Sequence, residues 1–123
     1  MNFRMMHNNI NVSELDKSLD FYAKALDLEE TRRLEDEDYI IVYLSDRSTA
    51  YRLELTWLRK TTGLYNLGDN EFHFAFATDD YSGALKRHTD MGCVVFVNDE
   101  MGIYFIEDPD GYWIEILPEG LSE

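Results

Sequence analysis

Residues 105–117 read F-I-E-D-P-D-G-Y-W-I-E-I-L and combine a strong turn signal with two apolar runs. In D-P-D-G at 108–111, proline presets one turn position and glycine relieves another, so the segment predicts two strands joined by a tight turn. In the second strand Ile114 and Ile116 share one face, and Glu115 points to the other. A buried carboxylate is costly unless it is paired or bound to a metal. Glu115 is therefore a candidate functional residue.

Three other strand-like runs carry a similar ionisable residue. His7 lies in M-M-H-N-N-I, Glu54 lies in Y-R-L-E-L-T-W, and His73 lies in F-H-F-A-F. The order histidine then glutamate occurs in both halves of the chain, which indicates a duplicated architecture. A lone strand histidine or glutamate is usually structural or solvated, so the inference depends on all four. Two imidazoles and two carboxylates form a ligand set for a divalent transition metal.

The remaining sequence predicts the same order of elements twice. The expected elements are a strand at 3–12, a helix at 13–27, strands at 28–35, 39–44 and 50–58, then a strand at 71–78, a helix at 79–91, and strands at 93–98, 102–107 and 112–117. Ser13 opens S-E-L-D, which is typical of a capping box. Glycine and asparagine at 59–70 indicate a linker. We predict one domain over 1–123, with module 1 at about 3–58 and module 2 at about 71–117.

Side-chain alternation predicts where the ionisable residues point. In each strand the histidine or glutamate faces away from the best hydrophobic run, as His73 does from Phe72, Phe74 and Phe76. This is expected if the sheet encloses a polar cavity. The predicted fold class is α+β, with two βαβββ modules forming a curved, barrel-like mixed sheet with helices outside.

Composition excludes several classes of partner. The chain has 123 residues, 45% of them apolar, which fits a folded domain with its own core. The formal charge of −14 argues against nucleic acid and anionic membranes. No apolar stretch approaches the ~18 residues of a membrane span. A single cysteine, Cys93, excludes an intramolecular disulfide, and with no visible signal peptide we expect a cytoplasmic location.

Four segments between about Met6 and Leu117 resemble a known family. They are S-L-D-F-Y-A-K-A-L-D-L, L-E-L-T-W, Y-N-L-G-D-N-E-F-H-F-A-F and F-I-E-D-P-D-G-Y-W-I-E-I-L. These segments are similar to glyoxalase I (lactoylglutathione lyase) of the short bacterial type, in the vicinal oxygen chelate superfamily. The resemblance implies that His7, Glu54, His73 and Glu115 are the metal ligands.

The resemblance also implies a reaction. The family isomerises the hemithioacetal of a 2-oxoaldehyde, such as methylglyoxal, and a thiol to a 2-hydroxyacyl thioester through an enediolate. Glu54 and Glu115 are the candidate catalytic carboxylates, and the resemblance favours Glu115 as the principal base. It also favours Ni(II) as the metal, with Co(II) second and Zn(II) third. We expect a homodimer with a small-molecule substrate, and the four ligands come from one chain or from two.

The chain departs from the family where glutathione would bind. Asn11 stands where glutathione-using members have an arginine, and Leu58 stands where they have an asparagine. A short turn at 98–100 replaces their lysine and glycine-rich loop. An anionic tripeptide would lose charge partners at each place, so the sequence leaves the thiol cosubstrate open. The candidate substrate-binding residues are Arg59, Lys60 and Asn11, and Arg52 and Arg4 are further possible replacements for the missing charges.

Three other functions are compatible with the same fold. They are an epimerase acting next to an acyl-CoA thioester, a thiol transferase or ring-cleaving dioxygenase, and a metal-free drug-binding protein. The transferase and dioxygenase usually use two histidines and one glutamate, so Glu54 argues against them. The epimerase shares the proton-transfer chemistry and is the stronger alternative.

Overall fold

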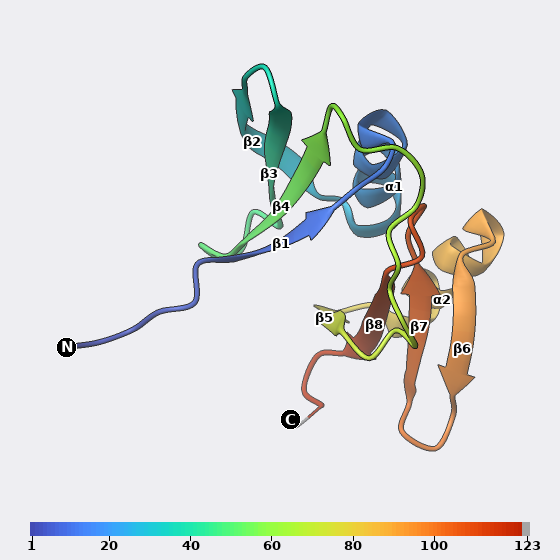
Figure 1. The fold of residues 1–123 in the computed structure, drawn as a ribbon. Coiled ribbons are helices and arrows are strands. Elements are labelled where there is room, and N and C mark those ends of the chain that lie inside the picture. Colours follow the sequence, from blue (N-terminus) through green and yellow to red (C-terminus); the bar gives the residue numbers. More distant parts are fainter. Residues whose placement is uncertain (122–123) are drawn as a thin grey trace. The chain divides into compact units, whose positions relative to one another are not determined.

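The computed structural model describes residues 1–121 and divides the chain into two compact units, Met1–Tyr65 and a second unit that begins at Asn66. Each unit contains one helix and four strands in the order βαβββ (Figure 1). The predicted fold class, α+β with two βαβββ modules, is confirmed. The division falls inside the range proposed as a linker, and the assignment of both modules to one domain stays a prediction.

The first unit is a four-stranded mixed sheet with one helix. Its elements are β1 (His7–Asn11), α1 (Leu15–Leu26), β2 (Glu29–Glu35), β3 (Tyr39–Ser45) and β4 (Arg52–Leu58). The strands lie in the order β1-β4-β3-β2, with β1 parallel to β4 and the other two pairs antiparallel. This order places β4 in the interior of the sheet, between β1 and β3.

Helix α1 covers the apolar face of this sheet. Leu15, Tyr22 and Ala25 recur at helical spacing and are buried. The sheet supplies Leu53 and Leu55, which alternate with polar residues along β4 and are buried as well. The opposite face of β4 therefore carries the residues between them, and Glu54 lies there.

The second unit repeats the arrangement. Its elements are β5 (His73–Thr78), α2 (Tyr81–Met91), β6 (Val94–Asn98), β7 (Ile103–Glu107) and β8 (Trp113–Pro118), with strand order β5-β8-β7-β6. The Asp80 side chain caps α2 by accepting a hydrogen bond from the Gly83 N–H at 3.0 Å. Gly92 ends the helix in the left-handed region at φ 72°, where glycine pays no steric penalty.

The D-P-D-G segment forms the predicted tight turn between β7 and β8. The Asp108 carboxylate accepts hydrogen bonds from the N–H groups of Asp110 and Tyr112, both at 2.9 Å. Gly111 has φ 91°, a value that a residue with a side chain rarely adopts. The turn fixes the start of β8 and therefore the position of Glu115 along it.

The duplication extends to the strand register. His7 is opposite Arg52 in the β1–β4 pair, and His73 is opposite Trp113 in the β5–β8 pair. Glu54 is opposite Tyr43, as Glu115 is opposite Phe105. A β-bulge occurs at the corresponding place in both sheets, between Glu30 and Arg32 and between Val94 and Phe96. Each position in one unit therefore has a defined counterpart in the other.

Three details differ from the sequence-based expectations. Helix α1 has Glu14 as its N-cap, and that side chain makes no capping hydrogen bond, so the expected capping box at Ser13 is replaced by a start one residue later. Strand β1 begins at His7 instead of residue 3, and residues 1–6 are exposed. Within residues 1–121 the strands form two separate four-stranded sheets that are not closed into a barrel.

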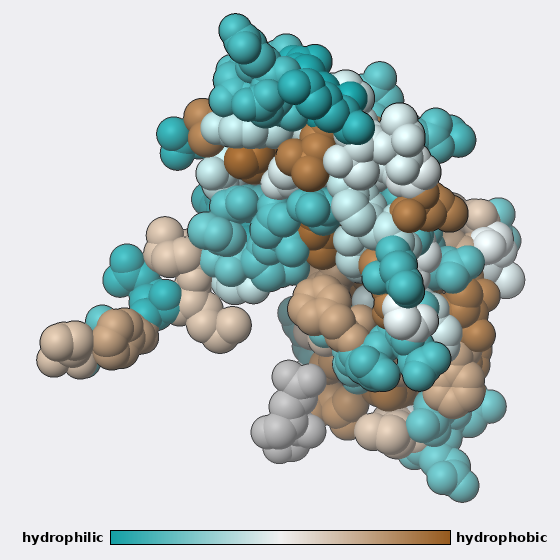
Figure 2. Space-filling view, viewed as in Figure 1, coloured by the Kyte–Doolittle hydropathy of each residue, from teal (hydrophilic) through white to brown (hydrophobic). Residues whose placement is uncertain are grey.

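The β2–β3 hairpin has a strongly hydrophilic surface, and both helices are short. Figure 2 shows hydrophilic residues over the β2–β3 hairpin, whose connection contains Asp36, Glu37 and Asp38. Helices α1 and α2 have 12 and 11 residues. In the described part of the chain, neither helix has the length and hydropathy needed to span a membrane.

Candidate metal centre

Each unit brings one predicted histidine together with one predicted glutamate. His7 Nε2 lies 3.0 Å from Glu54 Oε2, and His73 Nε2 lies 3.3 Å from Glu115 Oε1. The four predicted ligands thus form two pairs, at corresponding register positions of the two units. Within residues 1–121 no group of three or more histidine, cysteine, aspartate or glutamate side chains is placed to hold a metal ion. Convergence of both pairs on one cation stays a prediction.

The two pairs also share a pattern of burial. The side chains of Glu54 and Glu115 are 10% and 16% exposed, whereas those of His7 and His73 are 50% and 40% exposed. Each carboxylate is therefore largely withdrawn from water and has a half-open imidazole beside it. A buried carboxylate with one half-exposed partner is an unusual arrangement for stability alone.

The spacing within each pair fits metal coordination. Two adjacent ligands, each about 2.1 Å from an octahedral metal, lie about 3.0 Å apart. The Nε2–carboxylate distances of 3.0 and 3.3 Å agree with this value. The same distances fit a direct ion pair when the imidazole is protonated. Because nitrogen and oxygen donors without thiolate suit nickel, cobalt and zinc, the chemistry of the residues fits the predicted metals.

The surroundings of the first pair are polar. Asn9 is opposite Glu54 in the sheet, and its amide donates to Asn11 Oδ1 at 3.1 Å. The Thr56 hydroxyl donates a short hydrogen bond to Asn9 Oδ1. Asn11, predicted to bind substrate, therefore lies on the same strand face as His7, two residues beyond Asn9.

The surroundings of the second pair are aromatic. The ring of Phe105 is 5.2 Å from the ring of His73 and 5.5 Å from that of Trp113. Ala75 is opposite Glu115 on the β5 side, and its small side chain leaves space beside the carboxylate. The surroundings of Glu115 are thus aromatic, whereas those of Glu54 are hydrogen-bonded and polar.

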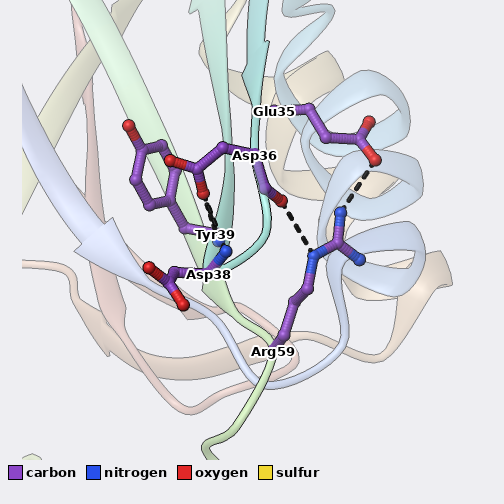
Figure 3. A network of polar contacts seen from close by, with 5 residues as sticks. All are labelled: Glu35, Asp36, Asp38, Tyr39 and Arg59. Carbon is purple, nitrogen blue, oxygen red and sulfur yellow. Dashed lines mark hydrogen bonds and ion pairs between the residues drawn. The ribbon is translucent and has the colours of Figure 1, made fainter.

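Arg59 lies on the other side of the first sheet. Its guanidinium donates to Glu35 Oε2 at 2.8 Å and to the Asp36 carbonyl at 3.0 Å, at the tip of the β2–β3 hairpin (Figure 3). It also lies 5.4 Å from the centre of the Trp57 ring. Trp57 is three residues from Glu54 along β4. Because side chains alternate between the two faces of a strand, Trp57 lies on the opposite face, which α1 covers. The structure does not bring Arg59 to the His7–Glu54 pair.

Lys60 and Arg4 are both exposed, and no contact recorded within residues 1–121 joins either of them to His7 or Glu54. Lys60 is exposed in the turn that follows β4, and Arg4 is exposed in the segment before β1. The substrate-binding roles of Arg59 and Lys60 stay predictions, and the contacts of Arg59 give it a structural role at the hairpin.

A hollow of about 290 Å³ beside His7 was not anticipated. Its lining residues are Met6, His7, Thr31, Arg32, Tyr43, Ala50 and Arg52. Arg52 was a candidate, and its distance of two residues from Glu54 is a sequence signal for the same face. Arg32 gives no such signal, because its place opposite Tyr43 depends on the bulge in β2.

The third histidine belongs to the core of the second unit. His88 is 2% exposed, and its Nδ1 lies 2.7 Å from the Tyr104 hydroxyl. Burial raises the pKa of the Tyr104 phenol well above its ordinary value, so the hydroxyl stays protonated. Burial also raises the pKa of the Cys93 thiol, which donates a hydrogen bond to the His88 carbonyl. These three residues form a buried polar cluster in the second unit.

Comparisons with known proteins agree with the fold. The Glyoxalase/Bleomycin resistance protein/Dioxygenase superfamily matches residues 4–116. A lactoylglutathione lyase of Neisseria meningitidis is 34% identical, covering 93% of this chain and 89% of the relative. A lactoylglutathione lyase of Escherichia coli O157:H7 is 31% identical, covering 94% and 93%.

A solved structure also resembles this chain. A glyoxalase I of Leishmania major, described as trypanothione-dependent, superposes with a TM-score of 0.84 at 28% identity and covers 96% of this chain and 88% of that one. The chain belongs to the Glyoxalase/Bleomycin resistance protein/Dioxygenase superfamily. Within it, the comparisons confirm the expected resemblance to lyases of the glyoxalase I type.

Proposed function

We propose that this chain is a metal-dependent glyoxalase I-type isomerase. It would convert the hemithioacetal formed from a 2-oxoaldehyde such as methylglyoxal and a thiol into a 2-hydroxyacyl thioester. The observation that carries the proposal is the His–Glu pair in each unit, with a donor spacing of 3.0 or 3.3 Å. The lactoylglutathione lyases among its relatives support the same reaction.

The residues that would hold the metal are His7, Glu54, His73 and Glu115. When bound, a divalent metal supplies Lewis acidity that stabilises negative charge developing on the substrate oxygens. Nickel is the first choice, cobalt the second and zinc the third. Each imidazole is half-exposed, and the largely buried carboxylate beside it would help to hold it in position.

The proton transfer would be carried out by a carboxylate of this chain. Isomerisation removes a proton from one carbon and returns it to the next, and one carboxylate can act as base and then as acid. We assign this role to Glu115. Its neighbours on the sheet, Phe105 opposite it and Trp113 two residues before it, are aromatic, and apolar surroundings would limit exchange of the transferred proton with solvent. Glu54 is the second candidate.

The proposed assembly follows from the same residues. Each unit supplies only half of the ligand set, so a complete site needs one half from each kind of unit. We propose a homodimer acting on a small molecule in the cytoplasm, without nucleic acid or membrane as partner. The acidic composition supports the exclusion of nucleic acid.

The test is thioester formation from methylglyoxal with several thiols, followed by ultraviolet absorbance, on protein loaded with nickel, cobalt or zinc. We expect turnover with at least one thiol, and a loss of about 10²-fold or more in kcat for Glu115→Gln. Metal content measured on the same samples separates loss of the base from loss of the metal. Full turnover by Glu115→Gln with metal bound would show that Glu115 is not the base.

An absence of stoichiometric metal after growth and reconstitution with all three ions would overturn the metal-dependent reaction. That result would favour a binding protein of the same fold. Turnover of an acyl-CoA epimer, without thioester formation from methylglyoxal, would assign the chain to the epimerase reaction instead.

A further inference from the structure

We propose that Arg32 and Arg52 form an anion subsite beside His7, which binds a carboxylate of an acidic thiol cosubstrate. The inference rests on the proposed isomerase function and specifies the chemical class of its thiol. The site is the hollow of about 290 Å³ that His7, Arg32, Arg52 and Tyr43 line together. It does not use Asn11, the position where related enzymes have an arginine.

The strand register places both arginines on the face that carries the first ligand pair. Arg52 is opposite His7, and Glu54 follows two residues later on the same face of β4. Arg32 is opposite Tyr43, which is itself opposite Glu54. Residues directly opposite in neighbouring strands share a face, so Arg32, Tyr43 and Glu54 form one row across the sheet.

In the described part of the chain neither guanidinium forms an ion pair with a carboxylate, although the sequence carries 25 acidic residues. Arg33, Arg47 and Arg59 form ion pairs with Glu30, Glu29 and Glu35. For Arg32 and Arg52, the structure records no ion pair within residues 1–121.

Each guanidinium is positioned by other contacts. Arg52 Nη1 donates to the carbonyls of Thr49 and Tyr51 at 2.9 and 3.0 Å, which fixes its orientation. The guanidinium of Arg32 lies 5.5 Å from the centre of the Tyr43 ring. Two oriented guanidinium groups without carboxylate partners are suited to bind a carboxylate, because each presents paired N–H donors.

The second unit shows that the fold does not require arginine at these positions. The counterpart of Arg52 is Trp113, which is opposite His73, and the counterpart of Arg32 is Phe96, which is opposite Phe105. Phe96 and Phe105 pack with ring centres 6.3 Å apart. The same two positions thus serve as an aromatic cluster in one unit and as a pair of cations in the other. The difference points to a ligand and not to a need of the sheet.

Two acidic side chains lie near the subsite, and each is engaged by another group. Glu54 lies near the hollow, but its Oε2 is directed to His7 at 3.0 Å. Asp46 interacts electrostatically with Arg52, but its carboxylate accepts hydrogen bonds from the N–H groups of Ser48 and Thr49 at 2.9 Å each. The hollow is small, so it fits one acidic end of a thiol and not a whole tripeptide.

The binding test uses metal-free protein and an unreactive probe. The probe is 3-(methylthio)propionate, and its methyl ester is the neutral comparison. Nitrogen-15 NMR titration follows the Nε–H signals of the arginines and the amides of β2 and β4. We expect the acid, and not the ester, to shift the signals of Arg32 and Arg52, and its affinity to fall about tenfold in Arg32→Gln and in Arg52→Gln.

Arg47→Gln is the matched control, since it removes one positive charge from the same unit at a residue that pairs with Glu29. Its affinity for the acid should equal that of the wild type. Equal binding of acid and ester, unchanged affinity in the Arg32 and Arg52 variants, or an equal loss in Arg47→Gln would each overturn the subsite.

The kinetic test separates this inference from the proposed function. Hemithioacetals of methylglyoxal with 3-mercaptopropionate and with neutral 2-mercaptoethanol are compared. For Arg52→Gln we expect kcat/KM to fall about tenfold more for the acidic thiol than for the neutral one. An equal loss for both thiols overturns the subsite and leaves the isomerase intact, whereas no turnover of either thiol by wild-type protein overturns the isomerase and leaves the NMR result to stand alone.

Discussion

The Glu54→Gln substitution should have opposite effects on stability with and without metal. Glu54 is 7% exposed and its recorded ion-pair partner is the half-exposed His7. Without metal, this carboxylate is largely withdrawn from water beside a single half-exposed imidazole, so its charge is costly. Replacing it by a neutral amide of similar shape should stabilise the metal-free protein by about 1 kcal/mol.

Metal should reverse this order. At a metal concentration one hundred times its Kd, the wild type gains about 2.7 kcal/mol, whereas a variant with affinity weakened about 100-fold gains about 0.4 kcal/mol. The wild type then becomes the more stable protein by about 1.3 kcal/mol. At about 4 °C per kcal/mol, the melting temperature should rise by about 11 °C in the wild type and about 2 °C in the variant.

Calorimetric scans of chelator-treated protein, with and without nickel, measure both effects. Glu37→Gln is the control, because it makes the same change at an exposed turn position of the same unit. If Glu54→Gln lowers the stability of the metal-free protein and leaves the nickel-induced shift unchanged, Glu54 is a structural residue and the reasoning is refuted.

Three further outcomes follow from the structure. Tyr104→Phe should lower the free energy of unfolding by about 1–3 kcal/mol in urea denaturation, because His88 loses its buried hydroxyl partner; no change would show that the bond does not stabilise the unit. Cys93 is buried with a raised pKa, so it should react with a thiol reagent at neutral pH only as fast as the protein opens, and immediate labelling would contradict its burial. Burial alone would raise the pKa of Asp46, but hydrogen bonds from two backbone N–H groups outweigh it and lower the pKa. The stability that Asp46 contributes is then present above its unfolded pKa of about 3.9 and is lost as the pH falls through the lower folded value. The unfolding free energies of Asp46→Asn and of the wild type should therefore converge below about pH 4. A constant difference between them down to about pH 2 would contradict this.

Most of the fold could be predicted from local patterns. Period-2 alternation around Glu54 and Glu115 and the turn at 108–111 place strands and their faces directly, because side-chain direction in a strand is set by parity. The helix boundary near Ser13 was wrong by one or two residues, since a side-chain cap depends on the approach of the preceding loop. The separation into two sheets was not visible, because local patterns do not specify which strands pair.

For the candidate site, the sequence predicted the ligand residues better than the arginines near them. The sequence predicted the four ligands as one set but not how they pair, and the structure places each histidine within 3.3 Å of the glutamate of its own half. Arg59 appeared suitable by charge and proximity to Glu54 in sequence, but odd spacing puts it on the α1 face, where Glu35 binds it. Arg32 was missed because a bulge sets its partner, and bulges leave no reliable mark in one sequence.

The number of metal ions bound per chain tests the central claim most directly. Isothermal titration of metal-free protein with nickel, combined with elemental analysis, should give one equivalent per chain. Although His7 and His73 lie in different units, His7→Ala and His73→Ala should each abolish that binding. Two equivalents per chain, with each substitution removing only one, would contradict a single cation shared by both His–Glu pairs.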